Sequence, residues 1–320
     1  MSIRTEAWPQ RLRPVIRNRS GHIRAIWRIG LYIVLIFGLS EVVDRAVGNV
    51  LLIHGKPLSD YALLVNRFTS KLIKFLCVLI PAIVLLKWLD RRPVALLGMG
   101  RYKGAVRELL VGMLLGVSII AVYALILWST HLASFSFNEL SAEVLLYAAA
   151  CLIVLVISAA YEEVLFRGYA FQSLIEGTNF GITLLLFALL FGLAHLQNAD
   201  ATPFSIAAAT AAGVFLGVLY YRTRALWMAI GAHCMWNWSL GPVFGTVTSS
   251  PFLRRTILTY TPLESRVGYV DAIGDGILAL GVLALTVYLW KASWLKPAEY
   301  NRTLWAPYPP RLTWPRRNNA

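Results

Sequence analysis

Ionisable side chains interrupt an apolar stretch in the middle of the chain. The string AAYEEVLFRGYAFQ places Glu162, Glu163 and Arg167 between hydrophobic flanks. On a helix, Glu163 and Arg167 lie four residues apart with the acid on the N-terminal side, which is the favourable orientation for an ion pair. Glu162 is rotated by about 100° around the axis and keeps no local partner, so it is the better candidate for a general base. The alternative is that both glutamates serve one arginine in a buried network without catalysis.

Two later apolar stretches carry histidine. Phe191 and His195 are four residues apart in the string FALLFGLAHLQNAD, so they share one helix face. His233 and Asn237 have the same spacing in the string ALWMAIGAHCMWNWSL and also share a face. A single histidine near a helix end is often an interfacial residue, which is the alternative for His195. Two polar groups on one face of an apolar segment, as with His233 and Asn237, indicate a functional site more strongly.

The composition shows what kind of element must position these side chains. Hydrophobic residues make up 58% of the 320 residues, charged residues make up 14%, and the mean hydropathy is +0.63. A soluble protein needs far less apolar sequence for its core, so we expect an integral membrane protein. The net charge of +14 does not indicate a nucleic-acid partner, because the basic residues lie between and beyond the apolar runs. The cysteines Cys77, Cys151 and Cys234 lie inside apolar runs and are expected to be buried and unpaired.

The apolar runs predict an all-α, polytopic bundle of about eight transmembrane helices. A helix that crosses ~30 Å of hydrocarbon needs about 20 apolar residues. Lipid cannot satisfy the polar groups of an irregular backbone, so each run must be helical. The runs lie near residues 26–43, 72–89, 105–128, 143–175, 179–196, 203–221, 224–246 and 272–290.

The distribution of Lys and Arg predicts the orientation. Cytoplasmic segments carry an excess of these residues. With both termini in the cytoplasm, the inside segments hold 22 of the 30 Lys and Arg and the outside segments hold 8. The loop 129–142 contains neither residue, which agrees with an outside position. We therefore expect both termini on the cytoplasmic side of a bacterial plasma membrane.

The three polar stretches can meet at one depth. With ~1.5 Å of rise per residue, Glu162 and His195 lie roughly 21 Å from the cytoplasmic margin, Asn237 roughly 20 Å and His233 about 14 Å. The small residues Gly231 and Ala232 predict that a neighbouring helix approaches closely at this point.

The three strings together resemble a known family. EEVLFR, FGLAH and HCMWN are similar to the EExxxR, FxxxH and HxxxN motifs of the CPBP family. This family contains the type II CAAX prenyl endopeptidases and the bacterial Abi, or bacteriocin-processing, proteins. The resemblance covers residues 143 to 246, and RRPVALLGMG at 91–100 resembles the short segment that precedes the family core.

The resemblance implies hydrolysis of a peptide bond within the membrane. The residues that would carry out this reaction are Glu162, Glu163, Arg167, His195, His233 and Asn237. Glu162 would activate the attacking water, with His195 helping to hold it. His233 and Asn237 would stabilise the oxyanion, and Arg167 with Glu163 would fix the geometry. Phe191 is the candidate for substrate binding.

Cofactor use stays open at this point. Glu163, His195 and His233 form a ligand set like that of catalytic zinc sites, while a metal-free mechanism with a water-activating glutamate uses the same residues. No HExxH string is present, which argues against a zinc protease of that kind. No GxSxG string indicates a serine nucleophile.

Two other functions use the same residues differently. A non-catalytic immunity or scaffold protein of this fold would keep them as a buried polar network. A transporter would use them to relay protons or bind a solute, but the internal repeat expected of many transporters is absent.

Asp275, an acid in the last apolar run, is interpreted as a packing or cavity-lining residue. The expected partners are the lipid bilayer and a peptide or membrane-protein substrate.

We divide the chain into five parts: a basic arm at 1–25, N-terminal transmembrane helices at 26–142, a CAAX-protease-like core at 143–246, an outer loop and last transmembrane helix at 247–292, and a tail at 293–320. The tail is rich in Pro, Trp and Arg. This composition predicts an irregular segment on the membrane surface.

Overall fold

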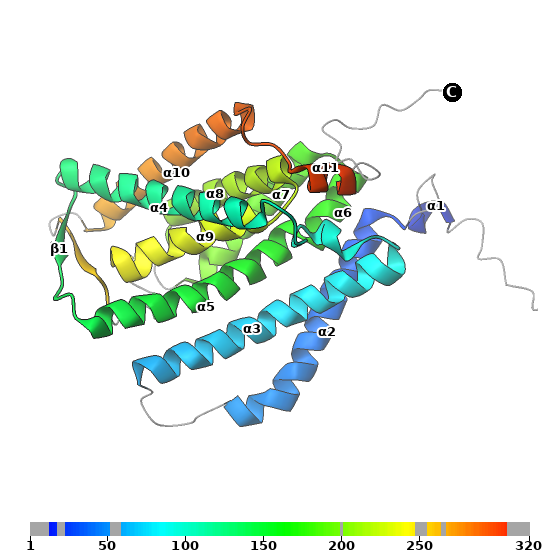
Figure 1. Cartoon of the computed structure of the whole chain (residues 1–320), viewed down its shortest axis with the longest axis horizontal. Coiled ribbons are helices and arrows are strands. Elements are labelled where there is room, and N and C mark those ends of the chain that lie inside the picture. The colour runs from blue at the N-terminus through cyan, green and yellow to red at the C-terminus, as the bar shows by residue number, and fades with distance from the viewer. Residues whose placement is uncertain are drawn as a thin grey trace, which may run out of the picture.

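A computed structural model describes residues 13–17, 23–51, 59–198, 201–246, 255–263 and 267–305. Most of the basic arm, most of the outer loop and the tail after residue 305 lie outside these ranges. The described part is a bundle of helices with a short two-stranded sheet at one end (Figure 1). The helices are α1 (Arg13–Ile16), α2 (Ala25–Leu51), α3 (Asp60–Val84), α4 (Ala105–Ser129), α5 (Ala142–Arg167), α6 (Tyr169–Gly177), α7 (Phe180–Ala194), α8 (Pro203–Thr223), α9 (Trp227–Trp238), α10 (Val267–Lys291) and α11 (Glu299–Trp305).

The prediction of a polytopic helical membrane protein is confirmed. Within the described ranges, seven helical segments are long and apolar enough to cross a membrane: Ala25–Arg45, Asp60–Leu89, Ala105–Ser129, Ala142–Gly177, Phe180–Gln197, Pro203–Thr223 and Ala272–Lys291. The expected run at 224–246 does not form one of these long helices. Its 12-residue helix α9 continues as a π-helical turn to Val243 and is buried among its neighbours.

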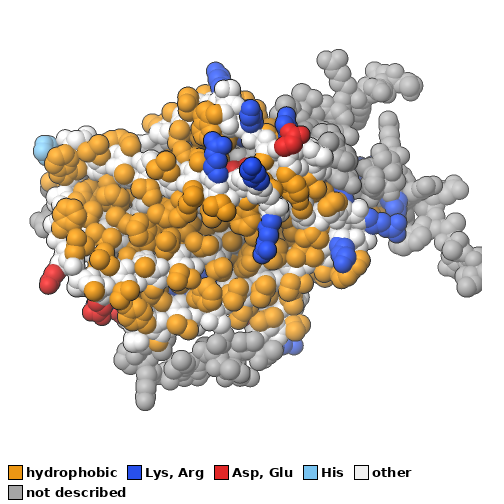
Figure 2. All heavy atoms as spheres, in the orientation of Figure 1, with side chains coloured by type: hydrophobic (Ala, Val, Ile, Leu, Met, Phe, Trp, Pro, Cys, Tyr) orange, Lys and Arg blue, Asp and Glu red, His pale blue; other side chains and the backbone are white. Residues whose placement is uncertain are grey.

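The outer surface of the bundle is apolar. Figure 2 shows hydrophobic side chains over most of one face, including the part that carries α4. Leu114, Val34 and Leu280 are more than half exposed, which is unfavourable in water and favourable in lipid. Lys and Arg side chains gather on this face toward the end of the bundle that holds α6 and α11 (Figure 2). This surface is that of an integral membrane protein with one basic end.

Capping residues mark where the helices that carry the site begin. The side chains of Ser141 and Asn179 accept hydrogen bonds from the first-turn N–H groups of α5 and α7. Helix α8 begins with a reciprocal capping box between Thr202 and Ser205, with Pro203 at the first helical position. These caps fix where each helix starts, and therefore which residues reach the centre of the bundle.

Helices α4 and α9 pack backbone against backbone. A Cβ atom added at Gly112 would overlap the carbonyl oxygen of Met228, and one at Gly116 would overlap that of Ala232. A Cβ at Gly231 would overlap the carbonyl oxygen of Leu109. The close approach predicted from the small residues beside His233 is therefore confirmed.

This contact predicts the effect of a single methyl group. The substitution Gly231→Ala should lower the free energy of unfolding by about 1–3 kcal/mol, because the helices must separate to admit the new carbon. Thermal unfolding in detergent micelles measures the change. Gly38→Ala on α2 is the matched control, since nothing lies within 4 Å of its added carbon. Equal stability of the two variants would contradict the close packing.

Charged side chains join three segments at the basic end. Arg28 of α2 donates from Nη1 to Asp90 at 3.2 Å and from Nη2 to Glu176 of α6 at 2.7 Å. Arg92 also pairs with Glu176. Arg28 is buried, so this network fixes α2, the segment after α3, and α6 relative to one another. The sequence analysis did not predict this network.

The structure corrects the expectation of an irregular tail. Residues Glu299–Trp305 form the helix α11, which begins after Pro297 and ends before the proline-rich residues. The Asn301 side chain donates to the carbonyl of Thr223, and Trp305 Nε1 donates to the carbonyl of Arg224. The expectation was wrong here because the prolines follow this segment and do not interrupt it. The tail residues Pro307, Pro309, Pro310, Trp314 and Pro315 lie outside the described ranges.

The short sheet adds a feature that the helical prediction lacked. Strand β1 (Ala133–Phe137) pairs antiparallel with β2 (Leu258–Pro262), with Ala133 opposite Pro262 and Phe137 opposite Leu258. The sheet joins the end of α4 to the segment before α10, at the end of the bundle opposite α6 (Figure 1). Its residues Tyr260 and Pro262 reach the central cavity described below.

Candidate active site

Helix α5 positions the two glutamates and the arginine as the spacing predicted. Arg167 Nη1 lies 3.0 Å from Glu163 Oε1, and both side chains are almost completely buried. Arg167 also donates from Nη2 to the carbonyl of Gly213 on α8 at 3.0 Å. The ion pair is therefore confirmed, and the carbonyl of α8 holds the guanidinium in one orientation.

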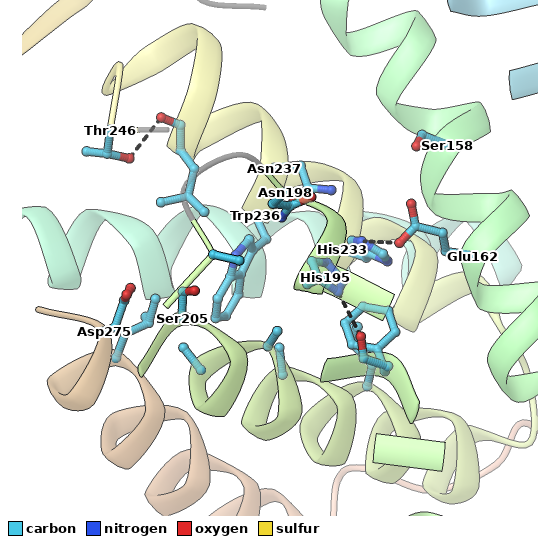
Figure 3. A pocket seen from close by; sticks show the side chains of 18 of the residues that line it. Ser158, Glu162, His195, Asn198, Ser205, His233, Trp236, Asn237, Thr246 and Asp275 are labelled. Carbon is cyan, nitrogen blue, oxygen red and sulfur yellow. Dashed lines mark hydrogen bonds and ion pairs between the residues drawn. The ribbon is translucent and has the colours of Figure 1, made fainter. Parts of the chain in front are cut away.

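His233 connects the two glutamates. Its Nδ1 lies 2.8 Å from Glu163 Oε1, and its Nε2 lies 3.6 Å from Glu162 Oε2. Figure 3 shows His233 beside Glu162 at one end of the cavity. A carboxylate accepts hydrogen bonds, so Glu163 orients the ring with Nδ1–H toward itself and Nε2 toward Glu162. The arrangement is a chain from Arg167 through Glu163 and His233 to Glu162.

His195 has a defined tautomer. Its Nδ1 lies 2.7 Å from the carbonyl oxygen of Phe191. A carbonyl cannot donate, so Nδ1 carries the hydrogen and Nε2 of the neutral ring has a lone pair. His195 follows the last residue of α7 and is partly exposed to the cavity. It can therefore accept a hydrogen bond from a water molecule.

Phe191 lies at the centre of the site. Its ring is 4.5 Å from the Arg167 guanidinium carbon, 4.8 Å from the His195 ring and 5.7 Å from the His233 ring. The side chain is only 2% exposed. These contacts place Phe191 as a support for the histidines and the arginine, and contact of its ring with a substrate stays a prediction.

A cavity of about 990 Å³ joins the predicted residues. Its walls come from α3, α4, α5, α7, α8, α9, α10 and β2. Glu162, His195, His233 and Asn237 line it, and Figure 3 shows these four side chains around the same space. Asn237 lies one helical turn after His233 on α9, so its amide faces the same cavity. Glu163 and Arg167 lie behind this wall and support it.

Two polar residues near Glu162 in the cavity were not predicted from the sequence. Lys71 of α3 places Nζ 3.7 Å from Glu162 Oε1, and Ser158 of α5 lines the cavity one turn before Glu162. Lys71 lies just before the apolar run predicted at residues 72–89, so it was not expected inside the bundle. Two signals were present: Ser158 precedes Glu162 by four residues, and Lys71 and Lys74 lie at the start of an apolar run. Asp275 lines the cavity, which is one of the two roles expected for it from the sequence.

Each candidate metal ligand already makes another hydrogen bond. Glu163 Oε1 is shared between Arg167 and His233 Nδ1, while His195 Nδ1 donates to a backbone carbonyl. Within the ranges that the structure describes, no three His, Cys, Asp or Glu side chains form a group that could hold a metal ion. The set Glu163, His195 and His233 therefore does not fit a metal in this arrangement.

The comparisons with known proteins agree with the motifs. The model of a family described as type II CAAX prenyl endopeptidase Rce1-like matches residues 144–239. This range contains all six predicted catalytic residues and Phe191. The resemblance to the CAAX-protease family is therefore confirmed for this segment. At the level of the family, the match supports an intramembrane protease.

A relative from Bacillus subtilis (strain 168) is also similar. It is named "Putative membrane peptidase YdiL" and is 33% identical over 82 residues. The similar segment covers 26% of this chain and 32% of the relative, so the chain matches about a third of that protein's length.

Proposed function

We propose that the protein is an intramembrane endopeptidase that hydrolyses a peptide bond of a membrane-associated protein or peptide through a water activated by Glu162. The observation that carries this proposal is the approach of Glu162 and His233 to 3.6 Å at one end of a cavity inside a membrane bundle. The family match over residues 144–239 supports the same reaction class.

In the first step, Glu162 removes a proton from water while the water oxygen attacks the carbonyl carbon of the substrate. His195 Nε2 accepts a hydrogen bond from the other O–H of that water and holds the water in line. The carbonyl oxygen becomes negatively charged. His233 Nε2, when it carries hydrogen, and the Asn237 amide donate to this oxyanion.

In the second step, the tetrahedral intermediate collapses. The bond between carbon and nitrogen breaks, and the proton on Glu162 moves to the leaving amine. The products are a carboxylic acid and an amine, which become a carboxylate and an ammonium ion when the acid's proton passes to the amine. Glu163 and Arg167 act as positioning residues, because they contact His233 and the backbone of α8 but not the cavity.

We propose that this reaction needs no metal ion. The support is the arrangement of the candidate ligands: within the described ranges no three His, Cys, Asp or Glu side chains form a group that could hold a metal ion, and Oε1 of Glu163 already contacts Arg167 and His233. Activity should therefore be unchanged after dialysis against EDTA followed by assay in metal-free buffer. Loss of activity that zinc restores would contradict the proposal and would imply a rearranged ligand set.

The experiment that tests the function is cleavage of a fluorogenic peptide library by the purified full chain in detergent and in proteoliposomes. The wild-type protein and Glu162→Gln are compared, and mass spectrometry identifies the cleaved bonds. Cleavage by the wild type alone supports the endopeptidase. Equal behaviour of both proteins favours a non-catalytic immunity or scaffold role, in which the same residues form only a buried network.

We also propose that both termini lie in the cytoplasm of a bacterial plasma membrane. Arg28, Arg92 and Arg222 lie at the end of the bundle that holds α6 and α11, and the sheet lies at the opposite end. The positive-inside rule then places the basic end in the cytoplasm.

A further inference from the structure

Three basic side chains follow one face of α3. Arg67, Lys71 and Lys74 are spaced by four and three residues, so they lie above one another on the helix. All three line the central cavity. We call these three residues the basic strip. No motif of the site contains them, and the mechanism above does not use them.

The charge of Lys71 and Lys74 is only partly balanced by the protein. Lys71 Nζ is 3.7 Å from Glu162 Oε1, which is too long for a hydrogen bond, and 5.5 Å from the Tyr161 ring centroid. Within the described part of the chain, Lys74 makes no ion pair or hydrogen bond. Asp275, the other acid of the cavity wall, lies on α10, across the cavity from Glu162 (Figure 3). The α3 wall of the cavity is therefore electropositive.

The basic strip lies at membrane depth, where an unbalanced positive charge is unfavourable unless an anion binds to it. Lys71 lies 11 residues into a helix that is long enough to span the membrane. It is therefore roughly 16 Å from the start of that span. Basic groups at such depth are rare and usually face a cavity or pair with an anion. The cavity is large enough for a short peptide segment, and Lys71, in the middle of the strip, lies beside the proposed general base.

We propose that the basic strip binds a carboxylate of the peptide substrate and so places the scissile bond over Glu162. This inference rests on the proposed endopeptidase function. Because Lys71 and Glu162 are 3.7 Å apart and an extended peptide advances ~3.3 Å per residue, the carboxylate lies within one or two residues of the scissile bond. It belongs either to the end of the peptide or to an acidic side chain. Lysines suit such a site because each is a point charge with three donors.

Peptide binding tests this proposal without needing cleavage. The probes are dansyl-labelled octamers of alternating Leu and Ala, in matched pairs. One pair ends in a free acid or an amide, and the other carries Glu or Gln at its seventh position with an amide end. The protein is the full-length Glu162→Gln variant, which should not turn the peptides over. One acidic probe should bind about tenfold more tightly than its neutral partner, and the pair that shows the preference identifies the source of the carboxylate.

Variants of Lys74 test whether the basic strip causes this preference for the acidic probe. In the Glu162→Gln background, Lys74→Met should abolish the tenfold preference, Lys74→Arg should retain it, and Lys74→Glu should reverse it in favour of the neutral probe. The matched control is Lys87→Met, since Lys87 lies at the end of the same span over the Trp88 ring and does not line the cavity. Vesicles of anionic or zwitterionic lipid should not change the preference.

Each alternative result has a separate meaning. Equal binding of acidic and neutral probes, or a preference that Lys74→Met and Lys74→Glu leave unchanged, would overturn the basic strip as a carboxylate site. Loss of the preference only in anionic vesicles would assign the strip to lipid phosphate instead. If the acidic probe binds more tightly but the wild-type protein cleaves no peptide, the basic strip remains a carboxylate site and the proposed endopeptidase function is wrong.

Discussion

Replacing Glu162 with Gln should lower the rate of peptide cleavage by about a thousandfold or more, because positioned general bases contribute about 10²–10⁴ and the amide cannot accept the proton. The substitution keeps the shape of the side chain and leaves the ion pair of Glu163 with Arg167 intact. We therefore expect unchanged thermal unfolding and a lower kcat. The measurement is the initial rate on a peptide that the library identifies.

Glu143→Gln is the matched control. Glu143 lies at the start of the same helix and pairs with Arg255, and neither residue lines the cavity. This variant should retain activity within about twofold, since a paired surface charge contributes little. If Glu162→Gln cleaves at the wild-type rate, Glu162 is not the base, and the buried-network interpretation of both glutamates gains support.

Replacing Arg167 with Met should lower the free energy of unfolding by about 3–5 kcal/mol. The reason is that Glu163, which is 0% exposed, would keep a buried charge without its cation. The Gly213 carbonyl and the ring of Phe191 would also lose their partner. Thermal and denaturant unfolding of the full chain in micelles measures this loss.

A second Arg–Glu pair of the same spacing provides the control. Arg45 and Glu41 on α2 are also four residues apart, but their side chains are 79% and 62% exposed. Arg45→Met should change the stability by less than about 1 kcal/mol. The double variant Glu163→Gln with Arg167→Met should recover part of the loss, because no uncompensated charge remains. Similar effects of Arg167→Met and Arg45→Met would show that burial does not decide the strength of the pair.

Much of the fold could be predicted because lipid permits few alternatives. An apolar run of sufficient length has to form a helix in the membrane, so seven of the expected spans appear as long helices. The run at 224–246 was harder, because length and hydropathy do not distinguish a spanning helix from the short buried α9. The sheet and α11 were missed, since they depend on contacts with distant segments such as Thr223 and Arg224.

Local spacing also determined the parts of the site that lie on one helix. The pairing of Glu163 with Arg167 and the shared face of His233 and Asn237 follow from the 3.6-residue period alone. What the sequence could not provide is the contact between helices. His233 lies 70 residues after Glu163 in the chain, and only the packing of α9 against α5 brings their side chains to 2.8 Å.

The sequence by itself determined a helical membrane protein and the residue types of its candidate site, because hydropathy and helical period are properties of neighbouring residues. The tertiary structure decided which of these residues touch. It placed His233, rather than His195, nearest Glu162, joined Glu163 to both Arg167 and His233, and brought Lys71 from α3 to the proposed base. These contacts depend on how separate helices approach one another. That approach is determined by the shapes and volumes of the side chains packed throughout the bundle.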